Sequence, residues 1–225
     1  MAAAAASSRF SHSNASHAFA EAKAYRVDES DKMSTVSTSR QFFTIGHSTR
    51  SIDEFISLLK AHGIRHLVDV RSIPKSRHVP QFNSEAFASS LHAAEITYTH
   101  LKALGGRRHG RKDSINTGWR NASFRGYADY MASPQFADGL AALIEIARTA
   151  PTTIMCAEAV PWRCHRSLIA DGLILKGWQV RDILTTSPAS EHKTTPFLKP
   201  VNGQATYPDP NESASLSFPS QESPG

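Results

Sequence analysis

The feature that most constrains the fold is a regular alternation of short apolar runs with longer amphipathic stretches. Five runs have the length and the β-branched or aromatic content of strands: residues 41–45 (QFFTI), 66–70 (HLVDV), 96–98, 152–155 (TTIM) and 179–184. Stretches with helical spacing of apolar residues separate them. Strands alternating with helices are joined by right-handed crossovers. The sequence therefore predicts a single-domain, Rossmann-like α/β fold, with three layers and a mostly parallel sheet that has helices on both faces.

Start and stop signals support the helices. Ser51 and Glu54 form a capping box before a helix that places Phe55 and Leu59 on one face. Further helices are predicted from residue 83 or 84, near 126–131, after Ser133-Pro134, and over 164–176.

The two ends of the chain differ in composition from the middle. Residues 1–39 are rich in Ala and Ser and are predicted to be a disordered extension, with translation from Met33 or a transit peptide as alternatives. Residues 187–225 hold seven of the twelve prolines and are predicted to be a disordered Pro-rich tail. The α/β domain is expected to span residues 40–186.

Composition excludes several classes of protein. Two cysteines in 225 residues do not make a disulfide scaffold, so we expect a reducing, cytoplasmic location. No run approaches the roughly 18 apolar residues of a membrane span, so no membrane partner is expected. Residues 40–186 contain 19 basic against 12 acidic residues, which gives +7. That charge favours an anionic ligand, although it is also compatible with solubility alone.

Polar side chains follow the predicted strands. His47 and Ser48 come after the first strand, Asp69 and Arg71 close the second, and Cys156 leads to Glu158 after the fourth. In parallel sheets, ligands bind beyond the carboxyl ends of the strands. We therefore expect these residues to meet at one edge of the sheet.

The densest cluster of reactive groups is residues 155–166 (MCAEAVPWRCHR). Cys156, close to a predicted helix start and to basic groups, is a candidate nucleophile. The strand, Cys, loop and helix resemble a cysteine phosphatase or rhodanese cradle in outline, but a phosphatase has Arg at the position of Trp162. Burial as a small apolar residue is the alternative for each cysteine.

The same residues suit a metal. Cys156, Cys164 and His165, with Glu158 or His47 as a further ligand, offer the thiolate and imidazole groups that zinc or iron prefers. The spacing differs from that of zinc fingers. Adjacent residues at a helix start are also expected to have difficulty in facing one ion.

Acid and base groups are present in the same region. Glu158 or Asp69 is a candidate general base, with His47 or His165 as the second proton-transfer group. The alternative is a structural ion pair between Glu158 and Arg71, Arg163 or Arg166, because an unpaired buried carboxylate is costly.

A basic segment lies between His100 and Arg125. Seven basic residues stand there against Asp113 alone, which gives +6, and glycines and aromatic residues are interleaved with them. Such a loop suits phosphates and stacked bases. The alternative is a solvated loop whose Trp119 packs on the core.

Five blocks in this order, FTIGHSTR, LVDVRSIPKSR followed by FN, LGGRR, FRGYADYM and MCAEAVPWRCHR, resemble the signature of the family called domain of unknown function 488, over about residues 42–184. The resemblance implies a compact α/β domain, found mainly in bacteria, whose polar blocks form the site. It carries no settled activity, and some descriptions of relatives mention DNA repair.

The sequence therefore predicts an enzyme acting on a nucleic acid or another nucleotide-like anionic substrate. A non-catalytic nucleic-acid-binding module and an enzyme for a small phosphorylated metabolite are the alternatives. The predicted catalytic residues are Cys156, Glu158, His165, His47 and Asp69. The predicted substrate-binding residues are Ser48, Arg71, Lys75, Arg77, Arg107, Arg108, Arg163, Arg166 and Trp119.

Overall fold

The computed structural model describes residues 40–211. The predicted N-terminal extension, residues 1–39, lies outside them, as do residues 212–225. The helices are α1 (Ile52–Ala61), α2 (Ser84–Ala93), α3 (Ala122–Met131), α4 (Pro134–Thr149) and α5 (Arg166–Leu175), with single 3-10 turns η1 (Pro80–Phe82), η2 (Lys102–Leu104) and η3 (Pro161–Arg163). No helix among these residues has both the length and the apolar content needed to cross a bilayer.

A six-stranded sheet lies at the centre of these residues. Its strands are β1 (Gln41–Gly46), β2 (His66–Asp69), β3 (Thr97–His100), β4 (Thr152–Cys156), β5 (Gln179–Ile183) and β6 (Ser190–Glu191). Their order is β3-β2-β4-β1-β5-β6, in which every pair is parallel except β5 with β6. The predicted mostly parallel sheet is confirmed.

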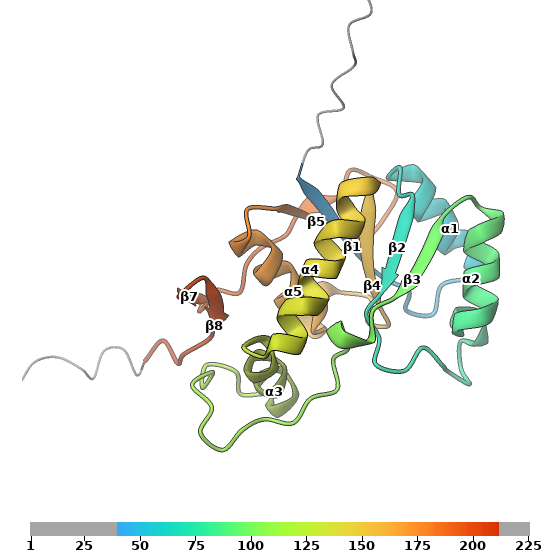
Figure 1. Cartoon of the computed structure of the whole chain (residues 1–225). Helices are drawn as coiled ribbons and strands as arrows, with labels where there is room; N and C mark the ends of the chain where they lie inside the picture. The colour runs from blue at the N-terminus through green and yellow to red at the C-terminus, as the bar shows by residue number, and fades with distance from the viewer. Residues whose placement is uncertain (1–39, 212–225) are drawn as a thin grey trace, which may run out of the picture. The chain divides into compact units, whose positions relative to one another are not determined.

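Helices cover both faces of this sheet, as Figure 1 shows. On one face Phe55 of α1 and Phe87 of α2 pack with Leu67 and Ile45 in one apolar cluster. On the other face the residues of α3, α4 and α5 pack with the opposite side of the same strands. The predicted three layers are therefore present, because successive side chains of each buried strand pack alternately against the helices on the two faces of the sheet.

The direction of the crossovers places the site. The chain leaves β1 for α1, on one face, and leaves β4 for α5, on the other face. β1 and β4 are neighbours in the sheet, and the His47 and Ser48 amides donate to the carbonyl oxygens of Cys156 and Ala157, so the two segments stay paired just beyond the strands. His47 follows β1 directly, and Cys156 ends β4, so both lie at the carboxyl edge, where ligands bind in sheets of this kind.

Local signals account for where the helices begin. The side chain of Ser51 accepts a hydrogen bond from the Glu54 amide at 3.1 Å, which confirms Ser51 as the N-cap, while the Glu54 carboxylate pairs with Arg50. Helix α3 begins earlier than predicted because the side chain of Asn121 caps its first turn. Helix α5 begins at Arg166 rather than at residue 164 because the 3-10 turn η3 leads into Cys164 in an extended conformation.

The predicted disordered tail is wrong for residues 190–207. Strand β6 pairs with β5, and β7 (Lys199–Val201) pairs with β8 (Gln204–Thr206). Tyr207 is fully buried, and its hydroxyl donates a hydrogen bond to Asp171 at 3.0 Å. The proline content led the prediction towards a solvated linker, but Phe197 and Tyr207 supply an aromatic face that packs on Trp119.

Candidate functional site

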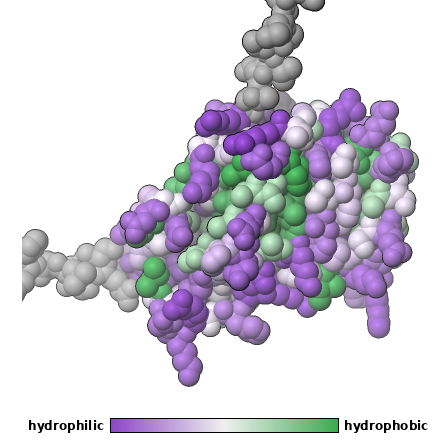
Figure 2. Space-filling view, viewed as in Figure 1, coloured by the Kyte–Doolittle hydropathy of each residue, from purple (hydrophilic) through white to green (hydrophobic). Residues whose placement is uncertain are grey.

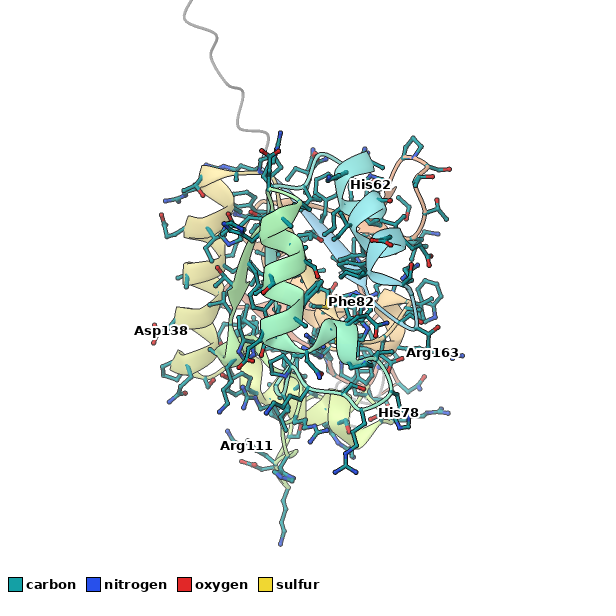
Figure 3. The ribbon with its side chains drawn as sticks, turned by 90° about the vertical axis from the view of Figure 1, so that its right-hand side faces the viewer. His62, His78, Phe82, Arg111, Asp138 and Arg163 are labelled. Atoms are coloured by element: carbon teal, nitrogen blue, oxygen red, sulfur yellow. The ribbon has the colours of Figure 1, made fainter. Side chains whose placement is uncertain are left out.

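A pocket of about 440 Å³ opens at the carboxyl edge of the sheet. Nine of the predicted site residues line it: His47, Arg71, Lys75, Arg107, Cys156, Glu158, Arg163, Cys164 and His165. Figure 3 shows His78 and Arg111 on the lower side of the molecule and Arg163 at its right-hand edge. The predicted meeting of these segments at one edge is therefore present in the structure.

Two thiols and an imidazole converge at the pocket. The Nδ1 atom of His165 lies 3.5 Å from the sulfur of Cys164 and 3.8 Å from that of Cys156. All three potential ligand atoms lie within 4.8 Å of one another, and both cysteines are free thiols. The expected difficulty in directing adjacent residues to one point does not arise, because Cys164 is extended and His165 stands at the N-cap of α5.

The two thiols differ in acidity. The pKa of Cys156 lies well below that of a free thiol because of a hydrogen bond from Cys164, to which the Glu158 amide adds, against the opposing effect of burial. The pKa of Cys164 is raised by burial and by its hydrogen bond to Cys156. Cys156 is therefore the more acidic of the two thiols.

The His165 ring is aimed by residues from distant parts of the chain. Its Nε2 lies 2.9 Å from the carbonyl oxygen of Val70, which can only accept a hydrogen bond. The backbone of Gly106 packs so closely that a Cβ atom there would come within 2.4 Å of Nδ1. The ring of Tyr127 lies 5.0 Å away, measured between centroids. Nδ1 is thus left facing the sulfurs.

Asp69 does not have the role of a free general base. It is fully buried and forms a two-pronged ion pair with Arg71, with contacts of 2.6 and 2.9 Å. The Tyr98 hydroxyl also donates to Asp69, and burial followed by the nearby carboxylate raises the Tyr98 pKa. The predicted catalytic role is therefore corrected: Asp69 fixes the direction of Arg71, which lines the pocket.

His47 is held within the same network. Its Nδ1 donates to the carbonyl oxygen of Ser48 at 2.8 Å, and its Nε2 lies 3.3 Å from the guanidinium of Arg71. The ring stacks on Phe82 with centroids 4.3 Å apart. Burial lowers the His47 pKa, so the neutral ring is favoured.

Arg166 is not a substrate clamp. The side chain is fully buried and donates to the carbonyl oxygens of Glu158 at 2.5 Å and Ala159 at 3.0 Å. Its Nε also reaches the hydroxyl of Thr44 at 3.4 Å. The prediction failed because the first turn of α5 faces the core, so Arg166 instead anchors the loop between Cys156 and η3.

Glu158 differs from the expectation of a buried, paired carboxylate. Its side chain is exposed, lines the pocket and forms no ion pair within residues 40–211. Its carbonyl oxygen instead lies against Gly46, where any Cβ atom would collide with it. The carboxylate is therefore free to contact a ligand in the pocket.

The basic residues divide into two groups. Lys75, Arg107 and Arg163 are exposed and line the pocket. Arg108 instead lies 3.7 Å above the ring of Tyr130 and donates to the Ala103 carbonyl oxygen, so its predicted binding role is corrected. Figure 2 shows hydrophilic residues projecting below the sheet, where Figure 1 draws the loop after η2.

Three other predicted substrate contacts lie outside the pocket lining. Trp119 stacks on Phe124 at 4.6 Å and packs on Phe197, which corresponds to the alternative in which it packs on the core. Ser48 and Arg77 do not line the pocket. Ser48 adopts a positive φ of 52° in the turn after β1, and Arg77 is exposed beyond the rim.

The pocket is also lined by residues that were not predicted as site residues, namely Ser72, Ile73, Ser76, Val79, Gly106, Ser123, Phe124 and Ala157. Gly106 had a usable signal, the double glycine of LGGRR, because paired glycines mark close backbone approach. Ile73 and Val79 carried no signal, since apolar residues in a loop are not distinguishable from packing residues without the fold.

The arrangement has two chemical capacities. The sulfur of Cys156, the more acidic of the two thiols, can act as a nucleophile, and the set Cys156, Cys164 and His165 can hold a metal ion. Either would act beside Glu158 and beneath the cationic side chains.

Comparison with known proteins identifies a family. No curated protein and no solved structure matches the chain significantly. A family model described as Domain of unknown function DUF488 matches residues 51–173, which is more than half of the chain. This region contains α1 to α4, the basic loop and the whole Cys156 to His165 segment, and so the chain belongs to the DUF488 family.

Proposed function

We propose that the protein is an enzyme acting on a nucleotide-like, phosphate-bearing substrate in the pocket at the carboxyl edge of the sheet. The observation that carries this proposal is that reactive and cationic groups line one cavity. Cys156, His165 and Glu158 share it with Lys75, Arg107 and Arg163. Its volume of about 440 Å³ lies within the range of small-molecule sites.

The charges assign a role to each group. Lys75, Arg107 and Arg163 are exposed at the pocket, where they attract phosphate groups from solution. Arg71, fixed by Asp69, presents a guanidinium at the pocket wall with its direction already set. Glu158 is the general acid or base, because it is the one carboxylate among the lining residues.

A polynucleotide is favoured over a small metabolite because the basic residues continue beyond the pocket. Arg77 and Lys112 are exposed outside the lining set, and Figure 3 shows Arg111 extending away from the body. A strand could follow these charges with one nucleotide in the pocket. A role in DNA repair is a narrower form of this proposal, and the free thiols fit a cytoplasmic location.

Binding can be tested by fluorescence anisotropy of a labelled single-stranded oligonucleotide over a range of salt concentrations. Neutralising Lys75, Arg107 and Arg163 together to Gln is expected to reduce the slope of log affinity against log salt by about two units. Arg148→Gln, an exposed residue at the end of α4, is the matched control and is expected to leave the slope unchanged. Absence of binding to oligonucleotides and mononucleotides at low salt would contradict the proposal.

Measurements of turnover and of binding distinguish an enzyme that acts on oligonucleotides from a non-catalytic binding module and from an enzyme for a small metabolite. Glu158→Gln is expected to lower the rate on a cleaved or modified oligonucleotide by about 100-fold while leaving its affinity within a few fold. Binding without any turnover would favour a non-catalytic module. Binding of mononucleotides or sugar phosphates without oligonucleotides would favour an enzyme for a small metabolite.

A further inference from the structure

We propose that Cys156, Cys164 and His165 bind one zinc ion, or a divalent ion of the same class, with a fourth coordination position that opens into the pocket. The metal site stands on the geometry of these three side chains alone. Its participation in catalysis rests on the proposed function.

The nitrogen-to-sulfur distances match those of an occupied site. Zinc bonds of about 2.0–2.1 Å to nitrogen and about 2.3 Å to sulfur, at tetrahedral angles, place a ligand nitrogen about 3.6 Å from a ligand sulfur. Nδ1 of His165 lies 3.5 and 3.8 Å from the two sulfurs. Both nitrogen-to-sulfur distances are therefore close to those of a zinc site, and the three donor atoms all lie within 4.8 Å of one another.

The second ring nitrogen of His165 is also arranged as in a metal site. A histidine ligand almost always donates its other N–H group to a carboxylate or a carbonyl oxygen, which fixes the tautomer and the ring orientation. Here Nε2 donates to the carbonyl oxygen of Val70 at 2.9 Å. A thiol pair that served only for packing would need no such orientation.

The position of the three donor residues in the fold explains why the fourth coordination position is open. Cys156 ends a central strand, whereas Cys164 and His165 precede a helix on one face, so the donors approach from two elements. All three also line the pocket. Three protein ligands with one open position are typical of catalytic zinc, whereas structural zinc sites have four protein ligands. An ion here would supply a Lewis acid at the base of the substrate pocket.

The test uses the full chain, purified without chelator in the presence of a reductant. Elemental analysis is expected to find about one zinc per chain. After chelation, titration with Co²⁺ is expected to produce near-ultraviolet thiolate-to-metal absorption and the visible bands of a tetrahedral ion. Absence of both zinc and the cobalt signal in reduced protein with two titratable thiols would overturn the proposal.

Ligand variants locate the ion. Cys156→Ser, Cys164→Ser and His165→Gln are each expected to weaken metal affinity by at least about 100-fold, as measured by competition with a chromophoric chelator. His78→Gln, an exposed histidine near the rim, is the matched control and is expected to retain wild-type affinity. Unchanged affinity in any of the three ligand variants would overturn the assignment.

Gly106→Ala is a second test of the metal site, for use if a ligand variant fails to fold. It removes no donor, but its Cβ atom would meet the His165 ring at 2.4 Å and force the ring to move. We expect it to weaken cobalt binding by about tenfold or more, and wild-type affinity in this variant would contradict the arrangement. The cobalt signal requires no substrate, so a bound metal without nucleotide binding would leave this site in place and remove only the proposed function.

Discussion

Nε2 of His165 donates a hydrogen bond to the carbonyl oxygen of Val70, and this contact determines which ring nitrogen faces the two cysteines. The neutral ring carries one proton, and the carbonyl oxygen requires it at Nε2. Nδ1 is therefore left with a lone pair directed at the sulfurs.

This tautomer is directly measurable. In reduced, metal-free protein, long-range ¹⁵N correlation spectra should show His165 with a protonated Nε2 and an unprotonated Nδ1. His165→Gln identifies the signals. A spectrum in which Nδ1 carries the proton would contradict the orientation described above.

The loop between Cys156 and η3 should depend on Arg166. Replacing Arg166 with Met leaves the Glu158 and Ala159 carbonyl oxygens without their charged donor, so we expect a loss of about 3 kcal/mol in the free energy of unfolding. Urea unfolding measures it. The exposed Arg148→Met is the control and should change stability by less than about 0.5 kcal/mol. Equal stability of the two variants would remove the anchoring role.

The segment after residue 187 should contribute to stability. Tyr207→Phe removes one of the donors to buried Asp171, and the expected loss in unfolding free energy is about 1–3 kcal/mol. Val201→Ala changes a half-exposed residue of the same segment and should lie within about 0.5 kcal/mol of wild type. A Tyr207→Phe protein as stable as wild type would mean that the segment is not packed as described.

His66 should titrate below the ordinary histidine range. Partial burial lowers its pKa from 6.5, so the fold favours the neutral ring. Its contribution to stability is present above pH 6.5 and is lost as the pH falls through the lowered pKa. An NMR titration of the His66 ring protons should give a midpoint below 6.5, and the His66→Gln variant should lose this part of the acid destabilisation. A midpoint at or above 6.5 would refute the prediction.

Periodicity predicted the fold because the buried strands and amphipathic helices are long enough to show their period. It also placed Cys156, Glu158 and His47 at one edge, since that follows from strand direction alone. The sequence does not predict in which direction a side chain near the start of a helix points. Arg166 faces inward and Arg163 outward because η3 precedes α5, and nothing in the residue types reports that turn.

Other site assignments failed because basic and aromatic residues have structural uses that composition does not separate from binding. Arg108 covers the Tyr130 ring, and Trp119 lies in an aromatic cluster with residues of the C-terminal segment. That segment was itself predicted to be solvated, so its partner in the fold could not be recognised. Asp69 is similar, because its pairing with Arg71 depends on the turn after β2.

The orientation of the His165 ring depends on Val70 and Gly106, and this has a consequence for when the cluster of Cys156, Cys164 and His165 forms during folding. Cys156, Cys164 and His165 lie within ten residues of chain, so their sulfurs and ring are near one another even before the sheet assembles. Val70 and Gly106 are brought to them only when β2 and the loop after η2 take their places. An incompletely folded chain thus carries the donors without their alignment, and the appearance of the aligned cluster reports the completion of folding.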